Sequence, residues 1–447
     1  MPDRVAHLSG DNASMRFIES SSHQCGMQGL QGETLGRQGD MQGFQDDMSW
    51  SVYDKAVISY YSRKYKPVPL PQRPNYSHED VSVIVPTIDT ESTFTDCMRL
   101  WLKANPREII IATVERNKAR VMELIKPLQK DADKIVIVIA PLANKRHQLM
   151  VGVKASKGKI FALVDDDVYW RSDGVVPYLL APFEDPRVGA VAGIQSAEIP
   201  SDRQDSRVIT PWESIATFDL NQWKSSREVH FAADGGCWCL SARTLFMRAS
   251  IIQNQSFADA YTQEVIGRRV VNTADDVVLT GLIFDRGWKV TIQNIIEAEV
   301  TTNIPQNHKF VWQVLRWDRG NFRTFLGYIF AYPGYRRMMQ RHPYTTFKMM
   351  ERLARPIWAF AYVWAWFQTF HTTPWVAYAY LAWITFGWNG YFSTYSSFLK
   401  NYPYCARQVW AFLFMDIVGP IVDIYVYFTM NNDNWLTRVA DTKDIEG

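Results

Sequence analysis

Five apolar runs rich in β-branched residues dominate the region between residues 80 and 300. They are VSVIVP (81–86), EIIIATV (108–114), KIVIVIA (134–140), KIFALV (159–164) and VGAVAGIQ (188–195). Amphipathic stretches with helical spacing separate the first four. Continuous apolar strands that alternate with helices are typical of a parallel sheet buried on both faces. The sequence therefore predicts an α/β domain built on a mostly parallel sheet.

Three consecutive acids follow the fourth apolar run, in LVDDDVYW (163–170). In parallel sheets, ligands bind at the carboxyl ends of the strands. In an extended segment Asp165 and Asp167 face one side and Asp166 faces the other. Carboxylate oxygens suit Mg²⁺ or Mn²⁺, which hold substrate phosphates. The run therefore predicts a divalent-metal site at Asp165 and Asp167, with a solvated acidic turn as the alternative.

Three other stretches carry groups suited to phosphates and sugars. They are NKRHQ (144–148), NTADDVVL (272–279) and QVLRWDRGNFR (313–323). Lys145 and Arg146 suit a phosphate, and one acid of the pair Asp275–Asp276 suits a general base for an acceptor hydroxyl. In the third stretch, arginine can grip a diphosphate and tryptophan can stack on a sugar ring. Taken singly, each has a structural alternative: a solvated loop, a helix N-cap and a helix lying on a membrane surface.

The C-terminal part has the composition of membrane helices. From Pro356 to Leu399 the chain contains no Asp, Glu, Lys or Arg, over about twice the roughly 20 residues that one bilayer crossing needs. The predicted spans are 354–371, 374–392 and 408–430. The third contains Asp416 and Asp423, which either face a protein interior or water path, or mark a partly interfacial helix. A globular core of aromatic helices is the alternative for the whole region.

Charge and composition indicate the orientation in the membrane, the class of partner and the compartment. Basic residues precede the first predicted span, and by the positive-inside rule they place the preceding domain in the cytoplasm. They are Arg336, Arg337, Arg341, Lys348, Arg352 and Arg355. The net charge of +2 disfavours a nucleic-acid partner. Five scattered cysteines suit a reducing compartment. Residues 1–48 read as a disordered polar tail, and 49–79 as an amphipathic segment with a proline-rich linker.

Together and in this order, these stretches resemble a processive family-2 glycosyltransferase from about Val81 to Arg323. The chain is similar to hyaluronan, cellulose and chitin synthases, and most resembles fungal membrane-bound type 2 polysaccharide synthases. The motifs that carry the resemblance are VSVIVPT, Lys145-Arg146, D-x-D at 165–167, ADGGCWCLSARTL, Asp275-Asp276, Q-x-x-R-W at 313–317 and NWLTR at 434–438. In the last motif Leu436 stands where hyaluronan synthases have glycine.

The resemblance implies a Rossmann-like GT-A domain at 80–305 that faces the cytoplasm. A Q-x-x-R-W segment with interface helices (306–350), two to three membrane helices (351–432) and a tail (433–447) would follow. The activity implied is inverting transfer from a UDP-sugar to a growing polysaccharide, coupled to export across the plasma membrane. Because the chain shows no span before its catalytic domain, a homo-oligomer or a partner membrane subunit would complete the channel.

The resemblance also implies roles for individual residues. Asp276, beside Asp275, would be the catalytic base, and Asp165 and Asp167 would hold Mg²⁺ or Mn²⁺. The UDP-sugar would be bound by Thr87, Asp89, Glu115, Lys145, Arg146, Asp165, Arg316, Trp435 and Arg438. The acceptor would be bound by Gly235, Gly236, Gln313 and Trp317. The acid that recognises uracil stays open between Glu115 and Asp89. A non-processive glycolipid transferase, similar to ceramide glucosyltransferases, and an inactive GT-A scaffold are the alternative functions.

Overall fold

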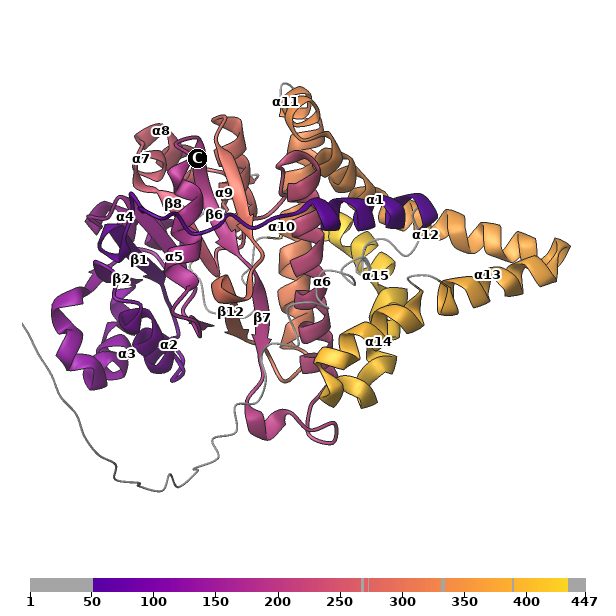
Figure 1. The fold of residues 1–447 in the computed structure, drawn as a ribbon, viewed down its shortest axis with the longest axis horizontal. Coiled ribbons are helices and arrows are strands. Elements are labelled where there is room, and N and C mark those ends of the chain that lie inside the picture. Colours follow the sequence, from indigo (N-terminus) through magenta and orange to yellow (C-terminus); the bar gives the residue numbers. More distant parts are fainter. Residues whose placement is uncertain (1–50, 267–268, 272, 331–333, 388–389, 433–447) are drawn as a thin grey trace, which may run out of the picture. The chain divides into compact units, whose positions relative to one another are not determined.

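The computed structural model describes residues 51–432 except 267–268, 272, 331–333 and 388–389 (Figure 1). All of these belong to one compact unit, Gln38–Gly447. The predicted polar tail at 1–48 lies outside the described residues. So does the NWLTR motif with Trp435 and Arg438, whose predicted contact with the donor stays a prediction.

A seven-stranded sheet in the order β11-β6-β8-β4-β1-β2-β3 forms the centre of the catalytic region. Its strands are β1 (Val81–Pro86), β2 (Glu108–Thr113), β3 (Ile135–Ile139), β4 (Ile160–Val164), β6 (Val188–Gly193), β8 (Thr244–Arg248) and β11 (Lys289–Gln293). All five predicted strands are present, and every residue of β1, β2, β4 and β6 is buried. β8 runs antiparallel between β4 and β6, and the other pairings are parallel. The mostly parallel sheet is therefore confirmed.

The helices that follow the first three strands are α2 (Phe94–Lys103), α3 (Glu115–Ile125) and α4 (Lys145–Ala155). α2 buries Phe94, Cys97, Met98 and Trp101, which recur at helical spacing on one face. α4 packs on β1 and β2, so its first residue lies beside the strand ends. The connection from β3 to α4 thus carries Lys145 to the edge of the sheet where β4 also ends.

Smaller elements complete the catalytic region. β5 (Val168–Tyr169), β12 (Val300–Asn303) and β7 (Gln195–Glu198) form a second sheet, and β9 (Val265–Ile266) pairs with β10 (Arg269–Val270). The short helices are α5 (Val175–Leu180), α7 (Ala249–Ile252), α8 (Gln255–Thr262) and α9 (Asp275–Asp285). The long helix α6 (Pro211–Asp234) begins with a capping box between Thr210 and Glu213, and Arg203 pairs with the same glutamate. These contacts satisfy the first backbone N–H groups of α6.

Helices make up the rest of the described chain. They are α1 (Ser51–Lys64), α10 (Lys309–Phe330), α11 (Gly334–Arg341), α12 (Pro343–Thr372), α13 (Pro374–Phe386), α14 (Tyr391–Asn401) and α15 (Val409–Thr429). α12 packs against α6, α10 and α15. Among the described residues, one helical segment, Pro403–Thr429, is long and apolar enough to cross a bilayer. The predicted span at 374–392 is wrong as a single helix, because α13 has 13 residues and ends at Phe386.

The acids of the last predicted span face the protein. Asp423 is fully buried and accepts hydrogen bonds from Arg352 and Arg355, while Asp416 accepts one from the Tyr395 hydroxyl. These contacts agree with acids that face a protein interior, and the position of the segment in a membrane stays a prediction. The same contacts correct the argument from basic residues. Lys348, Arg352 and Arg355 are buried in ion pairs with acids of the chain, so they are not available to lipid headgroups.

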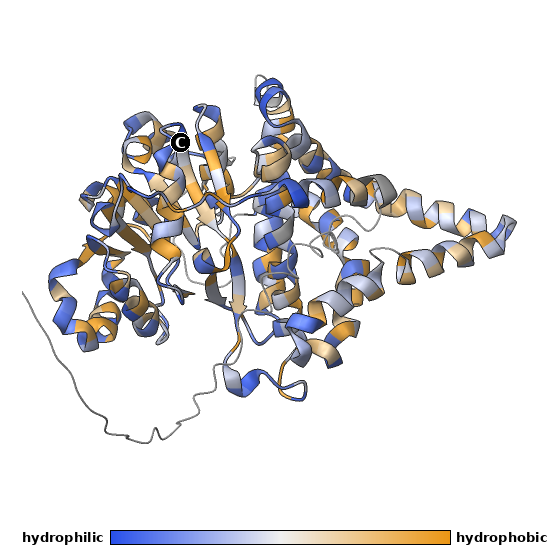
Figure 2. Cartoon of the chain, in the orientation of Figure 1, coloured by the Kyte–Doolittle hydropathy of each residue, from blue (hydrophilic) through white to orange (hydrophobic). Residues whose placement is uncertain are grey.

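Large apolar side chains nevertheless cover the outer faces of these helices. Exposed examples are Ile357, Phe360, Val363 and Trp364 on α12, Trp375 and Phe386 on α13, and Ile417, Ile421 and Phe428 on α15. Pale and orange residues predominate along α13 and α15 in Figure 2. Large exposed apolar side chains gathered on neighbouring helices are typical of surfaces that contact a membrane or another protein.

Candidate active site

A cavity of about 390 Å³ opens where β4, α4, α6, α9 and α10 converge. It gathers predicted residues that lie far apart in the sequence: Lys145, Asp165, Asp167, Asp275, Asp276, Gln313, Arg316 and Trp317. A cavity of this size suits a ligand of a few hundred daltons. The fold therefore brings the strand-end acids, the second acid pair and the Q-x-x-R-W motif to one place.

The acidic run begins where β4 stops. β4 ends at Val164, and Asp165, Asp166 and Asp167 all line the cavity. Asp166 is buried, and its Oδ2 accepts a hydrogen bond from Thr87 Oγ1 at 2.5 Å. Thr87 in turn is 1% exposed and hydrogen-bonds Thr90. Thr87 therefore holds Asp166 from the side away from the cavity, and its predicted contact with the donor stays a prediction.

Lys145 joins the two acid motifs. Its Nζ lies 2.8 Å from Asp165 Oδ1 and 2.8 Å from Asp275 Oδ2. Burial lowers the pKa of this ammonium, but the two carboxylates outweigh burial and raise the pKa well above its usual value. The position is fixed by the start of α4, where the Asn144 side chain accepts a hydrogen bond from His147 N–H. A permanent cation therefore stands between the strand-end acids and the helix-start acids.

Asp275 and Asp276 open α9, where the helix dipole favours negative charge. Burial raises the pKa of both carboxyls, but Lys145 overcomes burial at Asp275, whose pKa falls below its usual value. At Asp276 burial and the neighbouring charge of Asp275 both raise the pKa. Two adjacent carboxyls thus have pKa values pushed in opposite directions, which is the pattern expected of a charge-holding acid beside a proton acceptor.

One face of α10 closes the cavity from the other side. Gln313, Arg316 and Trp317 recur at i, i+3 and i+4 and all line it. Burial lowers the pKa of Arg316, and the carboxylates of Asp275 and its neighbours oppose this effect. The Arg243 guanidinium lies 5.2 Å from the centre of the Trp317 ring. A flat aromatic surface and fixed cations therefore face the acids across the cavity.

Several lining residues carried no role in the sequence analysis. Arg243 lies in the stretch ADGGCWCLSARTL, and its side chain donates to Gln195 Oε1 at 2.8 Å. Asp219 lines the cavity from α6 and accepts a hydrogen bond from Trp223 Nε1 at 3.2 Å. Burial, and then the charge of Asp318, raise the pKa of Asp219 to about 7. Local sequence gave no signal for these residues, because long-range contacts, such as those of α6 with α12 and α15, bring them to the cavity.

Comparison with known proteins identifies the family. The family model described as glycosyltransferase like family 2 matches residues 78–320. The chain belongs to this family. It is 80% identical to the NDP-glycosyltransferase ltbB of Aspergillus luteorubrus over 399 residues, which cover 89% of this chain and 98% of that protein. The chain is therefore a glycosyltransferase that uses a nucleotide-sugar donor, and its classification as an enzyme of family 2 is confirmed.

Other similarities are more distant. The chain is 32% identical over 285 residues to a type 2 glycosyltransferase of Zymoseptoria tritici, and 31% identical over 266 residues to one of Gibberella zeae. These matches span 58% and 49% of those relatives. The mannosyltransferase PcManGT from Pyrobaculum calidifontis, solved with GDP-Man and Mn²⁺, superposes with a TM-score of 0.54 at 16% identity. That match covers 83% of this chain and 96% of PcManGT, and it shows a GT-A-like fold.

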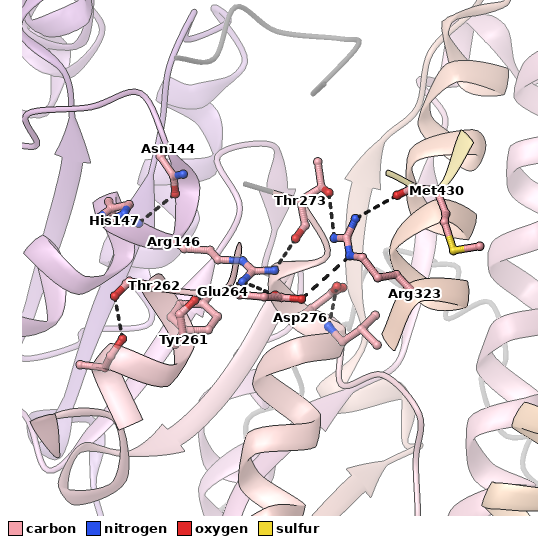
Figure 3. Close-up of polar contacts among 12 residues, drawn as sticks. Asn144, Arg146, His147, Tyr261, Thr262, Glu264, Thr273, Asp276, Arg323 and Met430 are labelled. Atoms are coloured by element: carbon pink, nitrogen blue, oxygen red, sulfur yellow. Dashed lines mark hydrogen bonds and ion pairs between the residues drawn. The ribbon is translucent and has the colours of Figure 1, made fainter. Parts of the chain in front are cut away.

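The structure places Arg146 away from the cavity, and its predicted donor-binding role stays a prediction. Its side chain is fully buried behind the cavity and does not line it. The guanidinium donates to Glu264 Oε2 at 2.7 Å and to the backbone carbonyl oxygens of Tyr261 and Thr273 (Figure 3). Successive residues of a helix point about 100° apart, so at the start of α4 only Lys145 reaches the cavity.

The two predicted acceptor glycines also have other roles. Gly235 ends α6 with a left-handed backbone, φ +71°, which glycine adopts without steric cost. A side chain at Gly236 would meet Thr345 Oγ1 at 2.3 Å, so this glycine lets the loop pack against the start of α12. Neither lines the cavity. The structure gives these glycines a capping role and a packing role, and their predicted contact with the acceptor stays a prediction.

Neither candidate for uracil recognition lines the cavity. Glu115 is exposed at the start of α3 and lies 3.7 Å from Lys118. Asp89 is exposed with a positive φ of 49°. The choice between Glu115 and Asp89 for uracil recognition therefore stays a prediction.

The acids suit a metal that arrives with its substrate. Within the described ranges no three His, Cys, Asp or Glu side chains converge on a closed metal cage. Asp165 and Asp167 supply two carboxylates in the cavity. Mg²⁺ is commonly bound by one or two carboxylates together with waters and substrate phosphates. The donor set therefore fits a divalent cation bound jointly by the protein and a sugar diphosphate.

Proposed function

We propose that this glycosyltransferase moves one sugar from a nucleoside-diphosphate donor to an acceptor hydroxyl by a single inverting displacement at a membrane surface. The observation that carries the proposal is the bridge from Lys145 to both Asp165 and Asp275. It places a phosphate-suited cation between acids suited to a metal and acids suited to proton transfer. If the diphosphate of the donor binds at the strand ends, the anomeric carbon of its sugar would lie near Asp276.

Asp276 is the base in this proposal. It takes the proton from the acceptor hydroxyl while the oxygen attacks the anomeric carbon and the bond to the diphosphate breaks. Its raised pKa suits the role, because proton transfer is most efficient when the pKa of the base approaches the working pH. Attack opposite to the leaving diphosphate inverts the anomeric configuration. Lys145 and Arg316 offset the charge that grows on the departing diphosphate.

Asp165 and Asp167 would hold Mg²⁺ or Mn²⁺. When bound, such a cation stabilises negative charge on phosphate oxygens without any proton transfer. Trp317, flanked by Arg243, offers a stacking face for the acceptor sugar or a comparable ring. The resemblance to hyaluronan-type synthases favours UDP as the nucleotide, and a donor panel that includes GDP-sugars tests it.

Chain elongation is the second candidate. The Q-x-x-R-W motif lies on α10 with all three named residues lining the cavity. Polysaccharide synthases carry this motif and glycolipid transferases carry a similar one, so the motif is compatible with both functions. A growing glycan would then be the acceptor, with export through a channel completed by a second copy or by a partner subunit. Product size separates elongation from single transfer.

Membrane association is the second part of the proposal. The exposed apolar residues of α12, α13 and α15, and the segment Pro403–Thr429, support burial of these helices in lipid. The catalytic domain would then face the cytoplasm, at the plasma membrane if the product is exported. Each lysine placed at the centre of a spanning helix costs about 3 kcal/mol. Release of an Ile417→Lys, Ile421→Lys variant by alkaline carbonate, with wild type retained, would support this. Equal release of both would contradict it.

The deciding experiment uses washed membranes that contain the full chain, with Mn²⁺ or Mg²⁺. Labelled UDP- and GDP-sugars are offered singly and in pairs, and the labelled product is sized. One sugar on a small or lipid acceptor supports single transfer, and high-mass polymer supports elongation. Label transfer that persists unchanged in Asp276→Asn would overturn the assigned mechanism. An inverted anomeric configuration, read by NMR, is expected for either product.

A further inference from the structure

A strained turn stands directly before the catalytic acids. Ala274 has φ 57° and ψ 36°, in the left-handed region, and forms the N-cap of α9. Of the non-glycine residues with positive φ in the described part of the chain, Asp89, Asn105 and Ala274, only the alanine lacks a polar side chain. Asparagine and aspartate reach this region through local hydrogen bonds, whereas alanine does not. Such a conformation persists only where its surroundings hold it.

The backbone of α10 packs closely against Ala274 at Gly320. A Cβ built on Gly320 would lie 2.4 Å from Ala274 Cβ and 3.3 Å from Ala274 Cα. Only glycine therefore lets the helix backbone approach the turn this closely. Gly320 lies one turn beyond Arg316 and Trp317 on the same helix. The helix that forms one wall of the cavity thus also fixes the turn from which the base projects.

A buried charge cluster holds the turn from the other side. Arg146 donates to the Thr273 carbonyl oxygen at 2.5 Å, and Arg323 of α10 donates to Thr273 Oγ1 at 3.4 Å. Glu264 joins the two guanidiniums, at 2.7 Å from Arg146 NH1 and 3.9 Å from Arg323 Nε. Figure 3 shows Thr273 between the two arginines, with Asp276 just beyond. Thr273 directly precedes the strained residue.

We propose that Gly320, Arg146 and Arg323 are positioning residues that set the direction of Asp276 through the turn at Thr273–Ala274. The inference rests on the proposed role of Asp276 as the base. It gives Arg146 a function in catalysis without contact with the donor. It also explains why α10 must hold both its cavity-lining residues and a glycine at fixed spacing. Displacing the base by about 1 Å can lower turnover about 100-fold without removing any reacting group.

The test exchanges one methyl group between two positions. Gly320→Ala introduces the clash with Ala274, and kcat should fall about 10- to 100-fold while the donor KM changes less than about threefold. Ala274→Gly removes the opposing methyl, and glycine adopts the left-handed conformation freely. The double variant should therefore recover kcat to within about threefold of wild type. The pH midpoint of kcat should shift in Gly320→Ala and return in the double variant.

Gly327→Ala is the matched control. Gly327 lies in the same helix, and a Cβ there meets nothing within 4 Å, so this variant should keep the kcat and pH profile of wild type. If Gly320→Ala does not fold, Thr273→Val replaces it, since valine keeps the shape but loses the oxygen that Arg323 contacts. The expected result is then a fall in kcat of about threefold or more at constant donor KM.

Two results would overturn the inference: a Gly320→Ala enzyme as active as Gly327→Ala, or a double variant no more active than Gly320→Ala. For Thr273→Val, an unchanged kcat would do so. Failure of the proposed function gives a different result. In that case Asp276→Asn would turn over as wild type does, whatever the turn variants show.

Discussion

The two acid motifs that meet in the cavity are built from the same residue on opposite kinds of backbone. Asp165 and Asp167 lie in the turn that follows a buried strand, whereas Asp275 and Asp276 form the first turn of a helix. The Asp165 side chain is 28% exposed and that of Asp275 is 6% exposed, although the same Lys145 ammonium touches both. Motifs that look alike in sequence therefore differ in their access to water.

That difference separates their chemistry. Carboxylates at an open strand end can take up an ion that comes and goes with the substrate. Buried carboxylates at the start of a helix interact strongly with each other and with the ammonium of Lys145. Burial and charge therefore drive their pKa values apart. The strand-end pair therefore suits binding, and the helix-start pair suits proton transfer. The following variants test this comparison.

Asp276→Asn should have the largest effect on turnover. The amide keeps the shape of the side chain and its hydrogen bond from Val277 N–H, but it cannot accept the acceptor proton. We expect kcat to fall about 10²- to 10⁴-fold, the usual contribution of a general base. Donor binding measured by calorimetry should be unchanged. Turnover above about a tenth of wild type would place the base elsewhere.

Lys145→Met should come next, because it removes the link between the two sides. Breaking a buried ion pair costs about 3 kcal/mol or more, here as a fall in the free energy of unfolding. The carboxyl of Asp275 has a lowered pKa in the fold. It therefore stabilises wild type above its unfolded pKa, near 3.8, and this contribution is lost as pH falls through the folded pKa.

In Lys145→Met that acid-dependent contribution should disappear. Denaturant titrations at a series of acidic and neutral pH values measure it, and Lys118→Met, at an exposed ion pair, is the control. Equal pH dependence of stability in Lys145→Met and wild type would contradict the bridge.

The sequence predicted the residues of the two acid motifs better than the residues that long-range packing brings to them. Apolar runs and the acids that follow them gave the strands and the strand-end pair, because both depend on local pattern and on the rule that ligands bind at strand ends. β8 was not predicted, since its antiparallel insertion depends on pairing with β4 and β6. Asp219 and Arg243 were missed for a similar reason, since only long-range packing turns them inward.

It was harder to predict which of two adjacent residues faces the cavity. Lys145 and Arg146 have the same charge and the same flanking sequence, yet one faces the cavity and the other faces Glu264. The phase of a helix start is set by what it packs against, here β1 and β2. Likewise, Arg352 was read as part of a topology signal before the first apolar run. Its partners Asp318 and Asp423 lie in other helices, where sequence spacing does not show them.

Asp167→Asn should have a smaller effect that metal can offset. Loss of one carboxylate should raise the Mn²⁺ concentration for half-maximal activity at least about tenfold, with partial recovery of rate at saturating metal. Asp166→Asn is the matched control from the same run, because the Asp166 side chain is held by Thr87. It should alter metal dependence little. Identical metal titrations of Asp167→Asn and wild type would remove Asp167 from the metal site.

Asp219→Asn should have the smallest effect, and one confined to alkaline pH. Burial and the charge of Asp318 raise the pKa of this carboxyl to about 7, so below that pH the wild-type group is a neutral hydrogen-bonding side chain like the amide. An acid whose pKa is raised in the fold contributes stability below its unfolded pKa and loses it as pH rises through the folded value.

Wild type should therefore lose stability between about pH 4 and pH 7, and Asp219→Asn should lose less over the same range. Activity of the two enzymes should agree near pH 6 and differ by a few-fold above pH 8 if the ionised carboxylate contacts the acceptor. Thermal unfolding and turnover across this range measure both. A constant difference at every pH would mean that Asp219 does not titrate near neutrality, and that α6 contributes shape and not charge to the acceptor side of the cavity.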